Sequence, residues 1–180
     1  MPSFHQTVKS GASFESDVKA LIAQYSDSVF SNVRIQTPYT VQSETEVDIL
    51  ALFGFVFLVV EVKNIRAIEG HITDPVWQLK GYQTGTEYTA LNIFTQNRLH
   101  VRSFKNAWFD NFNEFPKTIA CVVVPDECEF DDSLKPGQIY TISQFAAELV
   151  NLAKLPKDRQ SHYRLNFLVS SDNKITRKGG

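Results

Sequence analysis

The chain has 180 residues, of which 43% are hydrophobic and 21% are charged, and its formal net charge is −2. These values are typical of a soluble globular protein, and they exclude a chain-wide basic field, so any polyanion site must be a local patch. The length fits one domain with a sizeable core. We expect residues 1–180 to form that single domain, with flexible ends at 1–11 and 171–180.

The sequence predicts a cytoplasmic protein with no membrane partner. Residues 1–11 lack the apolar core of a signal peptide, and the longest apolar run, 51–60, is about half of a membrane span. Cys121 and Cys128 fit neither a zinc spacing nor a disulfide framework. We therefore expect plain thiols, which suit a reducing compartment.

A helix followed by three strands is predicted for the first third of the chain. The apolar residues that recur at helical spacing are Phe14, Val18, Leu21, Ile22 and Tyr25. Ser13 is the expected N-cap of this helix. The strands are predicted at residues 29–37, 46–53 and 55–63. Residues 67–72 are predicted to form either a short extension of the preceding strand or a turn. The secondary structure of residues 77–82 cannot be assigned from the sequence.

The second half of the chain predicts another long helix and further strands. Thr95 is its expected N-cap, and its apolar stripe consists of Val101, Phe104, Trp108 and Phe112. Strands are predicted at 118–124 and 138–142, a helix from Ser143 to about Lys154, and a last strand at 164–169. This order of helices and strands indicates a mixed α/β fold.

Gly54 and Phe55 separate two strand-like runs, which is typical of a two-residue type II′ hairpin. If Phe53 pairs with Val56, the register of the whole hairpin is set. The pairs on one face are then Leu52 with Phe57, Leu50 with Val59, Asp48 with Glu61, and Glu46 with Lys63. That face is apolar near the turn and charged at its far end.

Opposed carboxylates on a central strand repel each other, and burying them without a cation costs several kcal/mol. Either Lys63 or a divalent cation could lie between Asp48 and Glu61. Both carboxylates, the backbone carbonyl of Val62 and waters would suit an octahedral Mg²⁺. Alternatively, Glu46 and Lys63 form a salt bridge while both carboxylates point to solvent, or a bulge moves the carboxylates to opposite faces.

A carboxylate-bound Mg²⁺ and a lysine on the same strand suit phosphodiester hydrolysis. The ion lowers the pKa of water and stabilises charge on a phosphate oxygen, and the lysine holds the water or neutralises the transition state. Acyl transfer suits the chain less well, because no Ser/His/Asp or Cys/His set is apparent in the sequence.

Asp48, followed after twelve residues by Glu61-Val62-Lys63, resembles the D-(x)n-E-x-K core of the PD-(D/E)XK nuclease superfamily. The run EVDILALFGFVFLVVEVKNIRAIEGHI (46–72) is similar to the corresponding run of the NERD (nuclease-related) domain. The segments GASFESDVKALI (11–22) and NIFTQNRLHV (92–101) resemble two further motifs of that family. The likeness covers about residues 11–125. Ile93 replaces an expected Pro, and a second Gly before Glu15 is missing.

The resemblance implies a restriction-endonuclease-like core, in which a central mixed sheet is flanked by helices. It also implies that Asp48 and Glu61 bind Mg²⁺ (or Mn²⁺) and that Lys63 is the catalytic lysine. Gln96 would orient water or phosphate, and Glu15 would contact the same site or Lys63. The alternatives are a helix-dipole role for Glu15 and a surface position for Gln96. For His100, a surface or packing role is expected.

Arg98, Arg102 and Lys105 lie on one stripe of the second helix and, with Lys63, could bind phosphates. A solvated helix face is the alternative. No base-reading motif is visible, so the leading hypothesis is a metal-dependent nuclease that cleaves DNA with little sequence specificity. A catalytically weak nucleic-acid-binding or adaptor domain and a structural module with buried ion pairs are the other hypotheses. Homodimer formation is left open.

Overall fold

The computed structural model of the protein describes residues 11–26, 28–37 and 43–177. The expected flexible ends lie partly outside these ranges. Within them, helix α1 (Gly11–Ala23) begins at Gly11, two residues before the predicted cap at Ser13. Near the other end, Lys174–Ile175 form strand β9, so this part of the chain is a sheet edge rather than a frayed tail.

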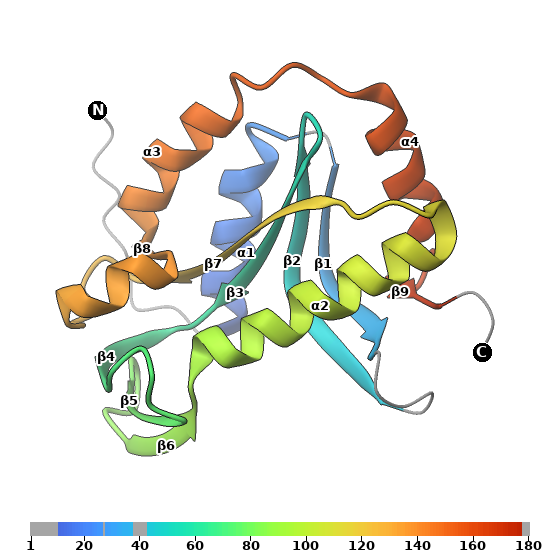
Figure 1. Ribbon diagram of the computed structural model, residues 1–180. Coiled ribbons are helices and arrows are strands. Elements are labelled where there is room, and N and C mark those ends of the chain that lie inside the picture. Colours follow the sequence, from blue (N-terminus) through green and yellow to red (C-terminus); the bar gives the residue numbers. More distant parts are fainter. Residues whose placement is uncertain (1–10, 27, 38–42, 178–180) are drawn as a thin grey trace.

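A six-stranded mixed sheet forms the centre of the molecule (Figure 1), in the order β8-β7-β3-β2-β1-β9. The other strands are β1 (Ser28–Gln36), β2 (Glu44–Phe53), β3 (Val56–Val62), β7 (Lys117–Val124) and β8 (Ile139–Thr141). β2 is antiparallel to both of its neighbours, and the other adjacent pairs are parallel. β3 is almost entirely apolar because it is covered on both faces.

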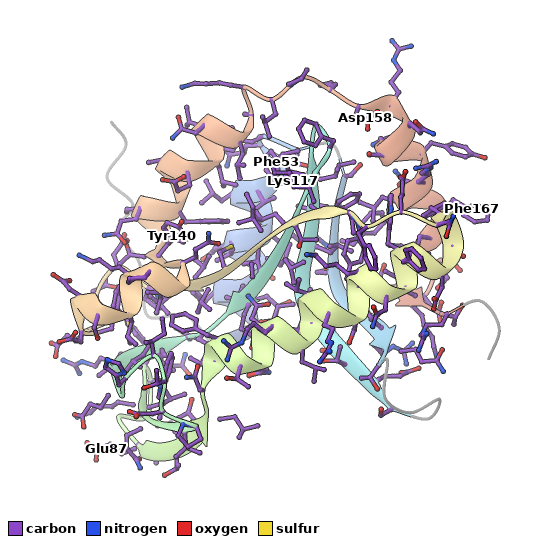
Figure 2. All side chains as sticks on the ribbon, viewed as in Figure 1. Phe53, Glu87, Lys117, Tyr140, Asp158 and Phe167 are labelled. Atoms are coloured by element: carbon purple, nitrogen blue, oxygen red, sulfur yellow. The ribbon has the colours of Figure 1, made fainter. Side chains whose placement is uncertain are left out.

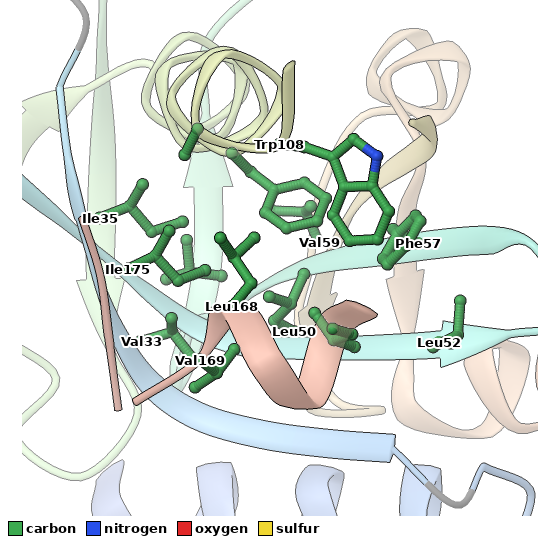
Figure 3. Close-up of a cluster of buried hydrophobic side chains, with 14 residues drawn as sticks. Val33, Ile35, Leu50, Leu52, Phe57, Val59, Trp108, Leu168, Val169 and Ile175 are labelled. Carbon is green, nitrogen blue, oxygen red and sulfur yellow. The ribbon is translucent and has the colours of Figure 1, made fainter. Parts of the chain in front are cut away.

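Four helices cover this sheet (Figure 1): α1, α2 (Ile93–Phe112), α3 (Ile142–Leu152) and α4 (Arg159–Leu168). α2 and α4 share one core with β1–β3, and α1 and α3 share another core on the opposite face. In the first core, Trp108 of α2 packs on Phe57 of β3 with ring centroids 4.6 Å apart (Figure 3). The expected restriction-endonuclease-like arrangement, a central mixed sheet flanked by helices, is confirmed.

A separate antiparallel sheet connects the end of β3 to the start of α2 (Figure 1). It consists of β4 (Ile65–Glu69), β5 (Val76–Gly81) and β6 (Glu87–Leu91). The two undecided stretches of the sequence therefore fall largely in β4 and β5, whereas β6 was not predicted. Glu87 of β6 and Asp158 before α4 mark opposite ends of the molecule in Figure 2.

The predicted hairpin register is confirmed for its apolar pairs, whereas the predicted pairs Asp48 with Glu61 and Glu46 with Lys63 lie beyond the end of the ladder. The β2–β3 ladder runs from Phe53↔Val56 through Leu52↔Phe57 to Ile49↔Val60. Gly54 has a φ of +59°, which fits the first central position of the expected type II′ turn. A β-carbon at Gly54 would lie 2.6 Å from the carbonyl oxygen of Pro156, so the turn also needs glycine for space.

Three sequence predictions are corrected by the helices. The N-cap of α2 is Asn92, whose side chain accepts the backbone N–H of Phe94, and Thr95 lies inside the helix. α3 is capped by Thr141 in a capping box with Gln144, not by Ser143. Residues 164–169, predicted as a strand, belong mostly to α4, because Asp158 caps a helix there and Leu165 and Leu168 turn toward the core.

Both cysteines are free and buried, as the sequence predicts. Burial raises the pKa of the Cys121 thiol far above its usual range and that of Cys128 to about 12, so neither is a reactive thiolate. The described residues contain a 3-10 helix, η1 (Asp132–Gly137), between β7 and β8. None of the helices in the described ranges has the length and hydropathy needed to cross a membrane.

Candidate active site

The two hairpin strands separate at the charged end of the β2–β3 ladder. The ladder's last pair is Ile49↔Val60, whereas β3 continues beside β7 as far as Val62↔Val123. Asp48 fills the resulting gap, since its Oδ2 accepts the backbone N–H of Val62 at 2.7 Å. A side chain thus replaces a backbone partner, and the Asp48 carboxylate is held at the point where the strands diverge.

Glu61 is the buried centre of this site, with 1% of its side chain exposed. Its Oε1 lies 2.6 Å from Nζ of Lys63, and its Oε2 lies 3.3 Å from Nδ1 of His100 on α2. The Lys63 side chain is 27% exposed and the His100 side chain 2%. Each oxygen of the carboxylate therefore faces a different nitrogen, one from the strand and one from the helix.

The two carboxylates differ in their pKa values. Burial and the neighbouring Glu61 carboxylate raise the pKa of Asp48 to about 7, although the Val62 N–H and the Lys63 charge lower it. Burial alone would raise the pKa of Glu61, but the contacts with His100 and Lys63 outweigh it and hold the pKa below its usual value. Glu61 is therefore ionised at neutral pH, and the Asp48 carboxylate is poised near its titration point.

The expected cross-strand pair of Glu46 with Lys63 is wrong. Glu46 pairs with Arg34 in the β1–β2 ladder, and the ammonium of Lys63 contacts Glu61 instead. The reason is the separation of the strands, since the β2–β3 ladder ends before it reaches these positions. The alternative in which Glu61 points to solvent is also excluded by its burial.

Helix α2 is fixed against the sheet by Asn97, one turn before His100. The Asn97 side-chain amide donates to the backbone carbonyls of Cys121 at 2.9 Å and of Val59 at 3.4 Å, in two adjacent strands. Gln96 lies half-buried in the first turn, four residues before His100 and hence on the same side of the helix. This placement is compatible with its expected role near the site.

Glu15 lies in α1, half-buried, and its charge reaches the same cluster. Burial and the carboxylate of Glu46 raise its pKa, with a smaller contribution from Glu61 and an opposing one from Lys19. The charge of Glu15 in turn contributes to the raised pKa of Asp48.

The basic residues of α2 lie on its outer side. Arg98 and Arg102 are exposed and Lys105 is half-buried. Arg98 also donates to the hydroxyl of Thr95 at 2.8 Å. All three are on the same helix as His100.

The described residues hold no group of three or more His, Cys, Asp or Glu side chains arranged to bind a metal ion. Two features nevertheless fit a divalent cation. Oε2 of Glu61 is buried without a hydrogen-bond partner among the described residues, and the pKa of Asp48 is raised first by burial and then by the neighbouring Glu61 carboxylate. Mg²⁺ commonly binds through one or two carboxylates and keeps several waters, which this donor set allows.

The contacts of His100 and Asn97 were not predicted from the sequence. Both are buried polar residues at helical spacing, three residues apart, on the face of α2 that packs on the sheet. Both could have been recognised in the sequence as polar residues at helical spacing from the apolar stripe of α2, where an apolar residue is expected. A buried polar side chain needs a partner, and in both cases the partner is on β3 or β7.

The sequence was compared with family models, with curated proteins and with solved structures. A family model described as "Nuclease-related domain" (NERD) matches residues 10–125, which include α1, the diverging hairpin, α2 and β7. A search of curated proteins and a search of solved structures each found no match.

Proposed function

The chain belongs to the nuclease-related domain family, and from this we propose that it is a metal-dependent nuclease that hydrolyses phosphodiester bonds in DNA with little sequence specificity. One observation carries the proposal: Asp48, Glu61 and Lys63 gather where β2 and β3 separate. A buried acid beside a lysine at the end of a strand is a costly arrangement. A role in phosphodiester hydrolysis would explain why the protein keeps the buried Glu61 beside Lys63.

The residues that would hold the ion are Asp48 and Glu61 through their carboxylates and Val62 through its backbone carbonyl. When bound, Mg²⁺ or Mn²⁺ would stabilise charge on a phosphate oxygen and lower the pKa of water. Because the pKa of Asp48 is raised to about 7 without a cation, part of the population carries a proton at neutral pH, and a bound cation would displace that proton.

The side chains around the carboxylates have separate tasks in the proposed reaction. The water oxygen bonds to phosphorus as the bond to the leaving oxygen breaks, and negative charge grows on the phosphate. The attacking water releases a proton to solvent, and the leaving oxygen takes up a proton from solvent. Lys63, partly exposed and already oriented by Glu61, neutralises that charge. Gln96 orients the water or a phosphate oxygen from the first turn of α2, and Glu15 adds to the negative potential that retains the cation.

Arg98, Arg102 and Lys105, with Lys63, form the proposed phosphate-binding surface. Contacts to phosphate carry no sequence information, which fits the absence of a base-reading motif from the sequence. The buried free thiols suit a reducing cytoplasm, where we place the activity. The second candidate, a nucleic-acid-binding or adaptor domain without turnover, is favoured by the net charge of −2 and by the two-carboxylate donor set.

The proposal is tested by incubating the purified protein with plasmid and with single-stranded DNA in Mg²⁺, in Mn²⁺ and in EDTA. Cleavage is expected with either ion and is expected to stop in EDTA and in Glu61→Ala. Cleavage that persists in EDTA would refute a metal-dependent mechanism. DNA binding without any metal-dependent product would favour the adaptor domain.

The combined variant Arg98→Ala, Arg102→Ala and Lys105→Ala is expected to weaken DNA binding and its dependence on salt. Each lost phosphate contact lowers the slope of log K against log salt by about 1. Binding is measured by fluorescence anisotropy at several salt concentrations. The matched control removes Lys154, Lys157 and Arg159, which are exposed, lie outside α2 and flank Asp158 in the sequence. An equal loss in both variants would argue against a surface on α2.

A further inference from the structure

We propose that His100 is a positioning residue that holds the Glu61 carboxylate in the orientation needed for cation binding, by donating its Nδ1–H to Oε2. The inference rests on the proposed function, because Glu61 matters here as a ligand. Nδ1 of His100 and Oε2 of Glu61 lie 3.3 Å apart, and neither atom forms an aligned hydrogen bond with the other or with any further described residue.

The contact between His100 and Glu61 is buried, so its loss would leave both polar atoms without a partner. Both side chains are at most 2% exposed, so water cannot freely replace either partner. A buried polar atom that stays unpaired costs stability, and a native protein retains such atoms mainly where they have a function. The separation of 3.3 Å is at the long end for a hydrogen bond, and contacts of this kind tighten when the bound state forms.

The position of His100 is determined by its helix rather than by its own side chain. Asn92 caps α2 at its N-terminus, and Asn97 ties the helix to the carbonyls of Val59 and Cys121. These two anchors fix where α2 crosses the sheet, and the next turn places His100 over Glu61. The helix therefore presents a donor at one defined point of β3.

Fixing Oε2 has a chemical consequence for Glu61. Without His100, the carboxylate could turn both oxygens toward Lys63, since Nζ is already 2.6 Å from Oε1. A carboxylate paired in that way would compete with a cation and would withdraw the lysine from the substrate. With one oxygen assigned to each nitrogen, Glu61 keeps a single orientation and Lys63 keeps its partial exposure. Partners of metal ligands commonly change metal affinity by about 10- to 100-fold when they are removed.

The test compares His100→Asn, His100→Gln and His100→Leu. The amide nitrogen of asparagine occupies nearly the position of Nδ1, whereas that of glutamine lies nearer the position of Nε2. Mn²⁺ affinity, measured by calorimetric titration, is expected to fall about 10- to 100-fold in His100→Leu and His100→Gln and to stay close to wild type in His100→Asn. The control is Ser103→Ala, which removes another buried, unpaired polar atom one turn along the same face.

A second readout needs no metal: the ¹³C chemical shift of the Glu61 carboxyl group. It is expected to match wild type in His100→Asn and to move in His100→Gln and His100→Leu. Should wild type bind no Mn²⁺, the proposed function fails while the carboxyl shift still tests the positioning role. Equal Mn²⁺ affinity and equal carboxyl shifts in all three variants would overturn the inference. Because the asparagine and glutamine variants are both polar, their comparison stands even if His100→Leu does not fold.

Discussion

Lys63→Met is expected to lower the rate of DNA cleavage by about 100- to 1,000-fold, the usual effect of removing one charge-stabilising donor from an active site. The ammonium lies 2.6 Å from Glu61 yet is 27% exposed, so it can reach a substrate phosphate from a fixed position. Methionine keeps the length and flexibility of the side chain but removes its charge. The rate is measured in single-turnover experiments with saturating Mg²⁺.

Two comparisons separate catalysis from binding in this experiment. Mn²⁺ affinity is expected to be retained or raised in Lys63→Met, because the variant removes a cation that competes for Glu61. Lys80→Met serves as the control, since Lys80 pairs with Glu87 on the separate small sheet at a distance of 3.7 Å. A cleavage rate within experimental error of wild type in Lys63→Met would contradict the role proposed for this lysine.

Asp48→Asn is expected to raise the stability of the metal-free protein at pH 8, by on the order of 2 kcal/mol or about 5 °C in Tm. The reason is that the native state raises the pKa of Asp48 to about 7, mainly through burial and through Glu61. Above pH 7 the folded protein holds an unfavourable buried charge, whereas the unfolded chain solvates it. Asparagine removes the charge and can still accept the N–H of Val62. Tm is measured in EDTA across the pH range.

The pH dependence has a definite sign. A raised pKa in the folded state means that stability is greatest at low pH and is lost as pH rises from about 4 to about 7. The gain in Asp48→Asn should therefore be large at pH 8 and nearly absent at pH 4. Added Mg²⁺ should raise the Tm of wild type but not of the variant, because a ligand bound to the native state stabilises it.

Asp131→Asn provides a control with the opposite pKa shift. Hydrogen bonds from Ser133 lower the pKa of Asp131, which lies at the surface, so its contribution is lost at low rather than high pH. This variant is expected to leave the Tm at pH 8 unchanged or slightly lower. A gain in Tm for Asp48→Asn that is equal at pH 4 and pH 8 would show that the charge of Asp48 is not its cause.

The hairpin is the part of the site that the sequence determines most directly. Gly54-Phe55 fixes the turn, the turn fixes the register, and the register brings Asp48 toward Glu61. The separation of the strands is not visible in that local pattern. It arises because β3 continues to pair with β7, a strand more than fifty residues later, after it has left β2. The register deduced from the turn between β2 and β3 contains no information about the pairing of β3 with β7.

The contacts of α2 and the helical structure of residues 159–168 could not be predicted from the local sequence for a different reason. His100 is buried against Glu61, and Asn97 joins the same helix to backbone carbonyls of β3 and β7, so both contacts depend on segments distant in the sequence. Residues 164–169 resemble a strand in isolation, yet the cap at Asp158 and the burial of Leu165 and Leu168 make most of them a helix. Tertiary packing overrides local preference at such positions.

The most direct test of the central claim is a crystal structure of the protein soaked in Mn²⁺, with anomalous diffraction recorded for the metal. We predict an anomalous peak in contact with the carboxylates of both Asp48 and Glu61 and within reach of the Val62 carbonyl. A crystal with no peak there, and with Lys63 still paired to Glu61 at high Mn²⁺ concentration, would contradict a metal-dependent site.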